Sequence, residues 1–114
     1  MIKIYGIPNC DTVKKARTWL TEQQVAHEFH DFKKQGVPEA ALDAWLASVG
    51  WEQLVNRKGT TWRKLDPAVQ AGVIDANSAR ALMLTQASVI KRPVVEWGNT
   101  VTVGFDAADW AERI

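Results

Sequence analysis

The sequence predicts an α/β fold with a mixed β-sheet whose two halves are separated by a block of helices. Three observations support this prediction. The chain opens with a short β-prone run, a helix pattern and a second β-prone run, which is the order of a parallel β-α-β unit. Near its end, two β-rich runs are separated by Gly98 and Asn99, which is a hairpin signal. Between these halves, apolar residues recur at helical spacing.

The opening half is expected to contain two parallel strands joined by a helix. The first strand covers Ile2–Tyr5 and ends at Gly6 and Pro8. The helix that follows has an apolar stripe formed by Val13, Ala16 and Leu20. The stretch Val25–Phe32 is predicted to be the second strand, because it is short and lies between polar turns.

The predicted helical insertion covers about residues 36–88. Pro38 fits the first turn of its first helix, and Gly50 fits the end of that helix. The core-facing side of this helix is predicted to consist of Ala41, Leu42, Trp45, Leu46 and Val49.

Two further helices are expected within the insertion. Asp66 followed by Pro67 is typical of a capped helix start, and Gly72 fits the end of this short helix. Another helix is expected from about Asn77 to Leu84. Its inward residues are predicted to be Ala79, Leu82 and Met83.

The closing half reads "PVVEWGNTVTVGF" and is predicted to form the hairpin, followed by a capped helix over Asp106–Ile114. The complete order is β-α-β, a helical block, a β-hairpin and a final helix. This is the layout of a thioredoxin-like fold (βαβ plus ββα) that carries an all-helical insertion. Residues 1–114 are expected to form a single domain.

Composition narrows the class of protein. The net charge of +1, from 14 basic and 13 acidic residues, gives the chain no strong overall electrostatic attraction for nucleic acid or an anionic membrane. No stretch approaches the roughly 20 apolar residues that span a bilayer, and the start lacks a signal-peptide pattern. A single cysteine excludes an internal disulfide and favours a reducing compartment. We therefore expect a cytoplasmic protein.

The one cysteine, Cys10, lies where the first strand gives way to the helix, in "IPNCDTVKKARTWL". Backbone N–H groups at a helix start and the helix dipole stabilise a thiolate, the nucleophilic form. A helix end contributes only about 0.3 to 2 kcal/mol, so further cations are needed. Lys14, one turn along, is well spaced to contribute, whereas Asp11 opposes the effect unless it caps the helix. The alternative is a buried, inert core cysteine.

The two histidines do not extend this site. His27 and His30 lie on a separate strand pattern, and one cysteine with two such histidines does not match structural zinc spacing. They are interpreted as residues on a strand face, and no metal site is predicted.

Three stretches, "IYGIPNCDTVKKARTWL", "LVNRKGTTWRKL" and "IKRPVV...VTVGF", resemble the arsenate reductase/Spx (ArsC-like) family across essentially the whole chain. The closest resemblance is to its YffB-type subgroup, small bacterial proteins proposed to be glutathione-dependent thiol reductases. The resemblance implies the thioredoxin-like fold with a helical insertion, in agreement with the element order above.

Site residues follow from the resemblance position by position. Cys10 matches the catalytic cysteine, Arg57 in "LVNRKG" a loop arginine, and Arg92 in "KRPV" the arginine before a cis proline, here Pro93. The resemblance implies that both arginines converge on Cys10, where guanidinium groups bind carboxylates or oxyanions. The remaining candidate substrate- or glutathione-binding residues are Lys14, Asn9 and Thr12.

The sequence also departs from the family pattern. Arsenate reductases of the family carry a histidine four places before the cysteine and a third arginine near the last strand, where this chain has Gly6 and Gly104. Spx-type regulators often carry CxxC, whereas the fourth position here is Val13. Without a second cysteine, a mixed disulfide on Cys10 must be resolved by an outside thiol, for which glutathione is the abundant candidate.

The predicted function is a single-cysteine thiol oxidoreductase with glutathione as co-substrate and an oxidised thiol or small oxyanion as substrate. One alternative is a non-catalytic regulator of Spx type that binds RNA polymerase or another protein. The other is a residual arsenate reductase. No direct contact with nucleic acid or membrane is expected.

Overall fold

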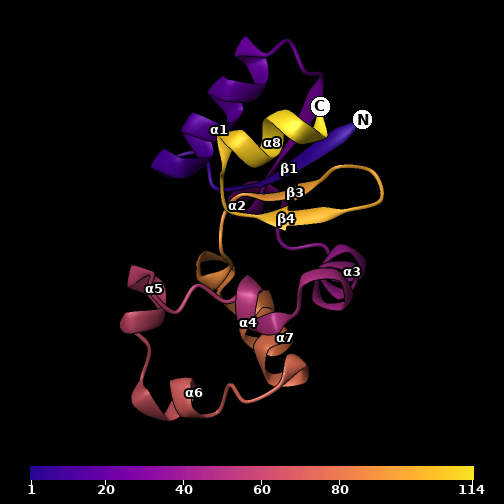
Figure 1. Cartoon of the computed structure of the whole chain (residues 1–114). Coiled ribbons are helices and arrows are strands. Elements are labelled where there is room, and N and C mark those ends of the chain that lie inside the picture. The colour runs from indigo at the N-terminus through magenta and orange to yellow at the C-terminus, as the bar shows by residue number, and fades with distance from the viewer. The chain divides into compact units, whose positions relative to one another are not determined.

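A four-stranded mixed sheet organises both ends of the chain (Figure 1). The structure is a computed structural model and describes residues 1–114. The strands β1 (Ile2–Gly6), β2 (His27–Asp31), β3 (Val94–Glu96) and β4 (Val101–Val103) lie in the order β2-β1-β3-β4. β1 pairs with β2 in parallel and with β3 in antiparallel fashion, and β4 pairs antiparallel with β3. The predicted parallel β-α-β unit and closing hairpin are confirmed.

The chain consists of two units. The sheet unit comprises Met1–Gln35 and Arg92–Ile114, and the helical unit comprises Gly36–Lys91. The sheet unit also contains α1 (Asp11–Glu22), α2 (Phe32–Gln35) and α8 (Ala107–Arg113). The helical unit has no strand of its own, as expected for the insertion. That the whole chain behaves as a single domain stays a prediction.

The core of the sheet unit lies between the sheet and the helices α1 and α8. It is formed by the buried side chains Ile4, Ala16, Leu20, Val95 and Trp110. The Trp110 ring centroid lies 4.7 Å from that of Phe105, 5.0 Å from that of Trp97 and 5.9 Å from that of Trp19. These edge-on contacts are a favourable arrangement for aromatic rings. The apolar stripe predicted for α1 is confirmed, because Val13, Ala16 and Leu20 are all buried.

The second strand is shorter than predicted. It covers His27–Asp31 rather than Val25–Phe32, and Phe32 instead begins α2. Asp31 causes this change. Its Oδ1 accepts a hydrogen bond from the Lys33 N–H at 2.9 Å, while its own N–H donates to Gln35 Oε1 at 3.1 Å. This reciprocal capping converts the end of the strand into one helical turn.

The helical unit begins with α3 (Glu39–Val49), which ends at Gly50 as predicted. Pro38 is the N-cap of α3 and not part of its first turn. The predicted inward face is only partly buried. Leu42 and Trp45 are buried, whereas Ala41, Leu46 and Val49 are partly exposed.

The remaining helices of this unit include two that were predicted. α6 (Pro67–Ala71) is capped by Asp66, whose Oδ1 accepts from the Ala68 N–H at 2.8 Å. α7 (Ala76–Thr85) buries the three predicted residues and begins with a capping box of Asp75 and Ser78. Three short elements were not predicted from the sequence, namely α4 (Trp51–Leu54), α5 (Thr60–Arg63) and the 3-10 turn η1 (Ala87–Val89).

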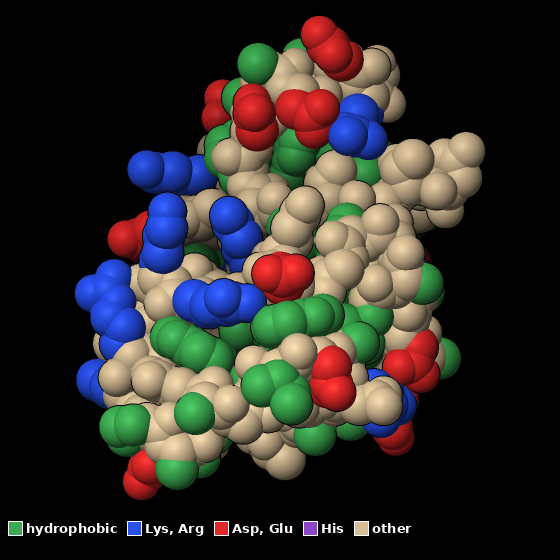
Figure 2. Space-filling model, turned by 60° about the horizontal axis from the view of Figure 1, so that its bottom comes forward, with side chains coloured by type: hydrophobic (Ala, Val, Ile, Leu, Met, Phe, Trp, Pro, Cys, Tyr) green, Lys and Arg blue, Asp and Glu red, His purple; other side chains and the backbone are tan.

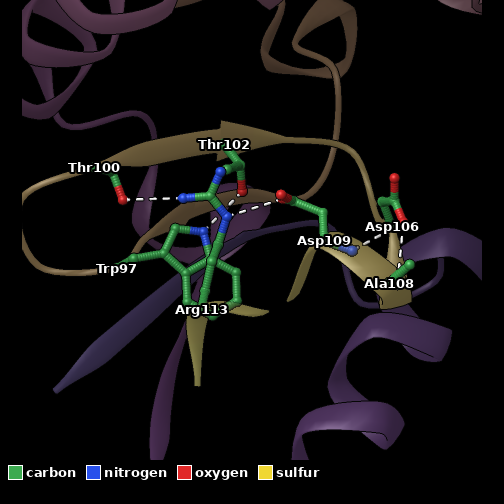
Figure 3. A network of polar contacts seen from close by, with 7 residues as sticks. All are labelled: Trp97, Thr100, Thr102, Asp106, Ala108, Asp109 and Arg113. Carbon is green, nitrogen blue, oxygen red and sulfur yellow. Dashed lines mark hydrogen bonds and ion pairs between the residues drawn. The ribbon is translucent and has the colours of Figure 1, made fainter. Parts of the chain in front are cut away.

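The closing hairpin turns at Gly98, whose φ of 120° is favourable only for glycine. The Trp97 N–H donates to the Thr100 carbonyl at 2.9 Å, and the Trp97 indole Nε1–H donates to Thr102 Oγ1 at 2.9 Å. Arg113 of α8 lies over the Trp97 ring, as Figure 3 shows, and donates to Thr100 Oγ1 at 3.3 Å. The terminal helix therefore holds the hairpin through both polar and ring contacts.

No helix of the chain is both long enough and apolar enough to cross a membrane.

Candidate active site

Cys10 occupies the junction between β1 and α1, where the sequence predicted it. It is the N-cap of α1, with φ −84° and ψ 126°, and its thiol is partly exposed. Its carbonyl accepts the first helical hydrogen bond, from the Lys14 N–H at 2.9 Å. Because the cysteine is not fully buried, the alternative of a core residue does not describe its surroundings.

The surroundings of Cys10 favour its thiolate. Partial burial raises the pKa of the Cys10 thiol, but this effect is outweighed. The Val13 N–H and the Arg92 guanidinium both hydrogen-bond to the sulfur, the charge of Arg92 adds to this, and the Thr12 N–H contributes further. The pKa of Cys10 therefore lies below its ordinary value, as expected for a thiol at a helix start next to a cation.

Arg92 belongs to the sheet unit and lies directly before β3. The Arg92–Pro93 peptide bond is cis, as the resemblance implied. Pro93 is buried, and its carbonyl accepts a hydrogen bond from the Gly104 N–H at 2.9 Å. Of the predicted site residues, Arg92 and Thr12 act on the Cys10 sulfur, Arg92 through its side chain and Thr12 through its backbone.

The side chains flanking Cys10 contribute less than the backbone does. Asn9 and Thr12 are exposed. Lys14, which was expected to support the thiolate, is exposed and is not among the groups that lower the pKa of Cys10. The Val13 N–H does lower the pKa of Cys10. The sequence did not indicate this role, because Val13 was predicted only as a core residue.

Arg57 lies in the helical unit, in the loop between α4 and α5. Its guanidinium lies 5.0 Å from the Trp51 ring centroid and 3.8 Å from Glu52 Oε2. With Lys58 and Lys91 it lines a hollow of about 280 Å³ within this unit. The predicted role of Arg57 at Cys10 stays a prediction.

Packing against Val13 favours glycine at position 6. A Cβ atom on this buried residue would lie 2.7 Å from Val13 Cγ2, closer than carbon atoms approach without displacement. The position at which arsenate reductases of the family carry histidine therefore has no space for a side chain here. Gly104 has a φ of 82°, a conformation that favours glycine.

The histidines lie at the sheet, as predicted. His27 Nδ1 lies 2.8 Å from the Val25 carbonyl oxygen, and the His30 ring centroid lies 4.9 Å from that of Tyr5. The chain has no group of three or more His, Cys, Asp or Glu side chains that could hold a metal ion.

Figure 2 shows one face of the molecule, on which both basic and acidic side chains are exposed. The net charge of the chain is +1, from 14 basic and 13 acidic residues.

Comparison with known proteins agrees with these features. The model of the ArsC family matches residues 5–113. The solved structure of the protein named YFFB has 49% sequence identity and a TM-score of 0.94, covering 99% of this chain and 98% of that one. An arsenate reductase (ArsC) related protein from Brucella melitensis has 50% identity and a TM-score of 0.77, covering 97% and 92%. The global transcriptional regulator Spx of Streptococcus agalactiae is 25% identical over 93% of this chain and 77% of its own.

These likenesses and the β2-β1-β3-β4 sheet confirm the predicted thioredoxin-like α/β fold. The fold is that of thiol-based reductases, and its one cysteine lies at the start of the first helix.

Proposed function

Because the chain belongs to the ArsC family, we propose that it is a thiol reductase that uses glutathione as co-substrate and Cys10 as its only nucleophile. The observation that carries this proposal is the partly exposed Cys10 thiol, whose pKa is lowered by helix-start N–H groups and by Arg92. The thiolate is the nucleophilic form of cysteine, so a thiol with a lowered pKa has a larger nucleophilic fraction at neutral pH. A structural cysteine would need neither the exposure nor the cation.

The reaction is a pair of thiol–disulfide exchanges. The Cys10 thiolate attacks the glutathione sulfur of a glutathionylated substrate thiol, so that a Cys10–glutathione disulfide forms and the substrate leaves as a thiolate. The thiolate of a second glutathione then attacks the glutathione sulfur on Cys10. Glutathione disulfide is released and the Cys10 thiolate is restored. In total, the disulfide bond of the substrate is broken and the disulfide bond of glutathione disulfide is formed, so that the second glutathione is the reductant.

An outside thiol is required because the chain has one cysteine and cannot form its own disulfide. Glutathione has two carboxylates, and the predicted binding residues include two arginines, Arg92 and Arg57, that can each hold one in bidentate fashion. Asn9, Thr12, Lys14 and Pro93 complete the proposed binding residues. A thiol of this kind functions where glutathione is kept reduced, so we place the protein in the cytoplasm.

The direct test is the intact mass of the protein after incubation with glutathione disulfide. We expect the mass to rise by one glutathionyl group, to return on addition of reduced glutathione, and not to change in Cys10→Ser. A wild-type protein that gains no glutathionyl group under conditions in which free cysteine does so would rule out this function.

The similarity to Spx supports one alternative, a regulator that binds RNA polymerase without catalysing a reaction. Immobilised wild-type protein and Cys10→Ser distinguish the two when incubated with purified bacterial RNA polymerase. The thiol reductase predicts no retention of polymerase by either protein. Retention by both, together with an unreactive Cys10, would favour the regulator.

A further inference from the structure

A hollow of about 380 Å³ lies along α1 and is lined by Lys14, Arg17, Thr18, Thr21, Glu22 and His27. Residues 14, 18 and 21 follow position 10 at intervals of four, eight and eleven. On an α-helix, positions with this spacing share one face. The hollow therefore continues the helix face at whose N-terminal end the Cys10 thiol lies.

The charge of this hollow is mainly positive. Lys14 and Arg17 lie on the side nearer Cys10, and the one carboxylate, Glu22, lies at the C-terminal end of α1. The guanidinium of Arg17 lies 4.0 Å from the Phe29 ring centroid, so it is held against β2 rather than extended freely into solvent. A cation that is already oriented loses less conformational entropy when it binds a carboxylate.

The spacing of Cys10 and Arg17 fits a short stretch of polypeptide. Arg17 follows Cys10 by seven positions, and at 1.5 Å per residue the two lie about 10 Å apart along the helix. An extended chain covers this distance in about three residues. When the cysteine of a bound substrate lies at Cys10, a carboxylate about three residues before or after it in the substrate can therefore reach Arg17.

We propose that this hollow docks an acidic segment of a protein substrate, with an Asp or Glu about three residues from the glutathionylated cysteine. The proposal rests on the thiol reductase function above and names its substrate class. The substrate disulfide lies at Cys10, whose thiolate takes the glutathionyl group, and the docked segment leaves as a free thiolate. Arg17 acts by positioning the substrate and takes no part in the exchange itself.

The test uses synthetic peptides of identical composition that carry one glutathionylated cysteine. In one pair, Glu lies three residues before or after the cysteine and Lys lies at the far end. In the second pair, Glu and Lys exchange places. The readout is kcat/KM for release of the peptide thiol with reduced glutathione present, and glutathione disulfide serves as the small substrate that has no acidic residue three positions from its cysteine.

Two variants locate the effect on the protein. Arg17→Gln removes the charge and keeps most of the stem that packs over Phe29. Lys15→Gln is the matched control, because it removes the same charge from an exposed residue of the same helix that does not line the hollow.

For one of the two placements of Glu, we expect Arg17→Gln to lower kcat/KM about threefold, a typical effect for one exposed ion pair. Lys15→Gln should leave it within experimental error, and neither variant should change the rate with glutathione disulfide. If glutathione disulfide reacts but all peptides react alike, or if Arg17→Gln matches Lys15→Gln, the docking proposal is wrong and the thiol reductase stands. If glutathione disulfide fails to modify Cys10, both are wrong.

Discussion

The guanidinium of Arg92 donates a hydrogen bond to the sulfur of Cys10, and its charge stabilises the thiolate. The two residues come from opposite ends of the chain, Cys10 from the start of α1 and Arg92 from the position before β3. Their contact therefore exists only when the sheet has brought β1 and β3 together.

The reactivity of Cys10 should depend on pH in a characteristic way. Because the pKa of Cys10 is lowered in the folded protein, the thiolate forms as the pH rises through a value below that of an ordinary thiol. The rate of alkylation by iodoacetamide should follow the same curve, whereas urea-unfolded protein should give the ordinary midpoint. A folded midpoint at or above about 8.5 would contradict the nucleophile assignment.

Replacing Arg92 by Lys should separate its charge from its geometry. Lysine keeps a cation near Cys10 but lacks the planar fork that binds a carboxylate through two parallel hydrogen bonds. We expect glutathionylation of Arg92→Lys to slow by about three- to tenfold, while the alkylation curve of Cys10 shifts little. Glutathionylation as fast as in the wild type would show that Arg92 does not bind glutathione through its fork.

Arsenate should be a poor substrate. A tetrahedral oxyanion is best enclosed by several donors that converge on one point, and this chain has glycine at two of the family's positions, Gly6 and Gly104. Initial rates of arsenite formation with glutathione as reductant should be at the level of Cys10→Ser. This prediction would be wrong if arsenite formation required Cys10 and were as fast as the reaction of Cys10 with glutathione disulfide.

Removing the charge of Arg57 tests whether the helical unit contributes to glutathione binding. Arg57→Gln should raise the KM for glutathione about two- to fivefold, the range of one exposed ion pair, without changing the alkylation curve of Cys10. Lys64→Gln is the matched control, since Lys64 is also exposed and does not line the hollow of Arg57. Equal KM values for the two variants would exclude Arg57 from the binding site.

Adding one methyl group at Gly6 should destabilise the protein. In Gly6→Ala, the new Cβ would lie 2.7 Å from Val13 Cγ2, and relieving this overlap should cost about 1 to 3 kcal/mol of unfolding free energy. Gly72→Ala, whose Cβ meets ordinary contacts at 3.5 Å, should be near neutral in the same urea titration. Partial recovery in the double variant with Val13→Ala would identify the overlap as the cause, whereas an unaltered Gly6→Ala would disprove it.

Elements that repeat their pattern over two turns or more were predictable from sequence. The stripe of α1 and the buried residues of α7 follow directly from spacing, and the hairpin follows from Gly98. The helices α4 and α5 are one turn long, which is too short for a period to be recognised. The end of β2 depended on a hydrogen bond between Asp31 and Lys33, a local competition that residue types alone do not resolve.

The residues of the candidate site also differ in how far the sequence could predict them. Cys10 was found because a strand followed by a helix places it at a helix start. The N–H of Val13 belongs to the backbone, so no side-chain motif reveals it. The approach of Arg92 to Cys10 depends on long-range sheet pairing, and only a resemblance to proteins of the same fold could indicate it in advance.

The division of the sheet unit into two chain segments determines the order in which the protein can form during synthesis. Residues 36–91 are contiguous, so the helical unit has all of its residues before β3 is made. In the sheet, Tyr5 pairs with Val94 and Lys3 with Glu96, and such distant pairing carries a large loop-closure entropy. While the ribosome makes the insertion, β1 can pair only with β2 and keeps one open edge. The nascent chain is therefore most exposed to strand-to-strand association until Val94 has emerged.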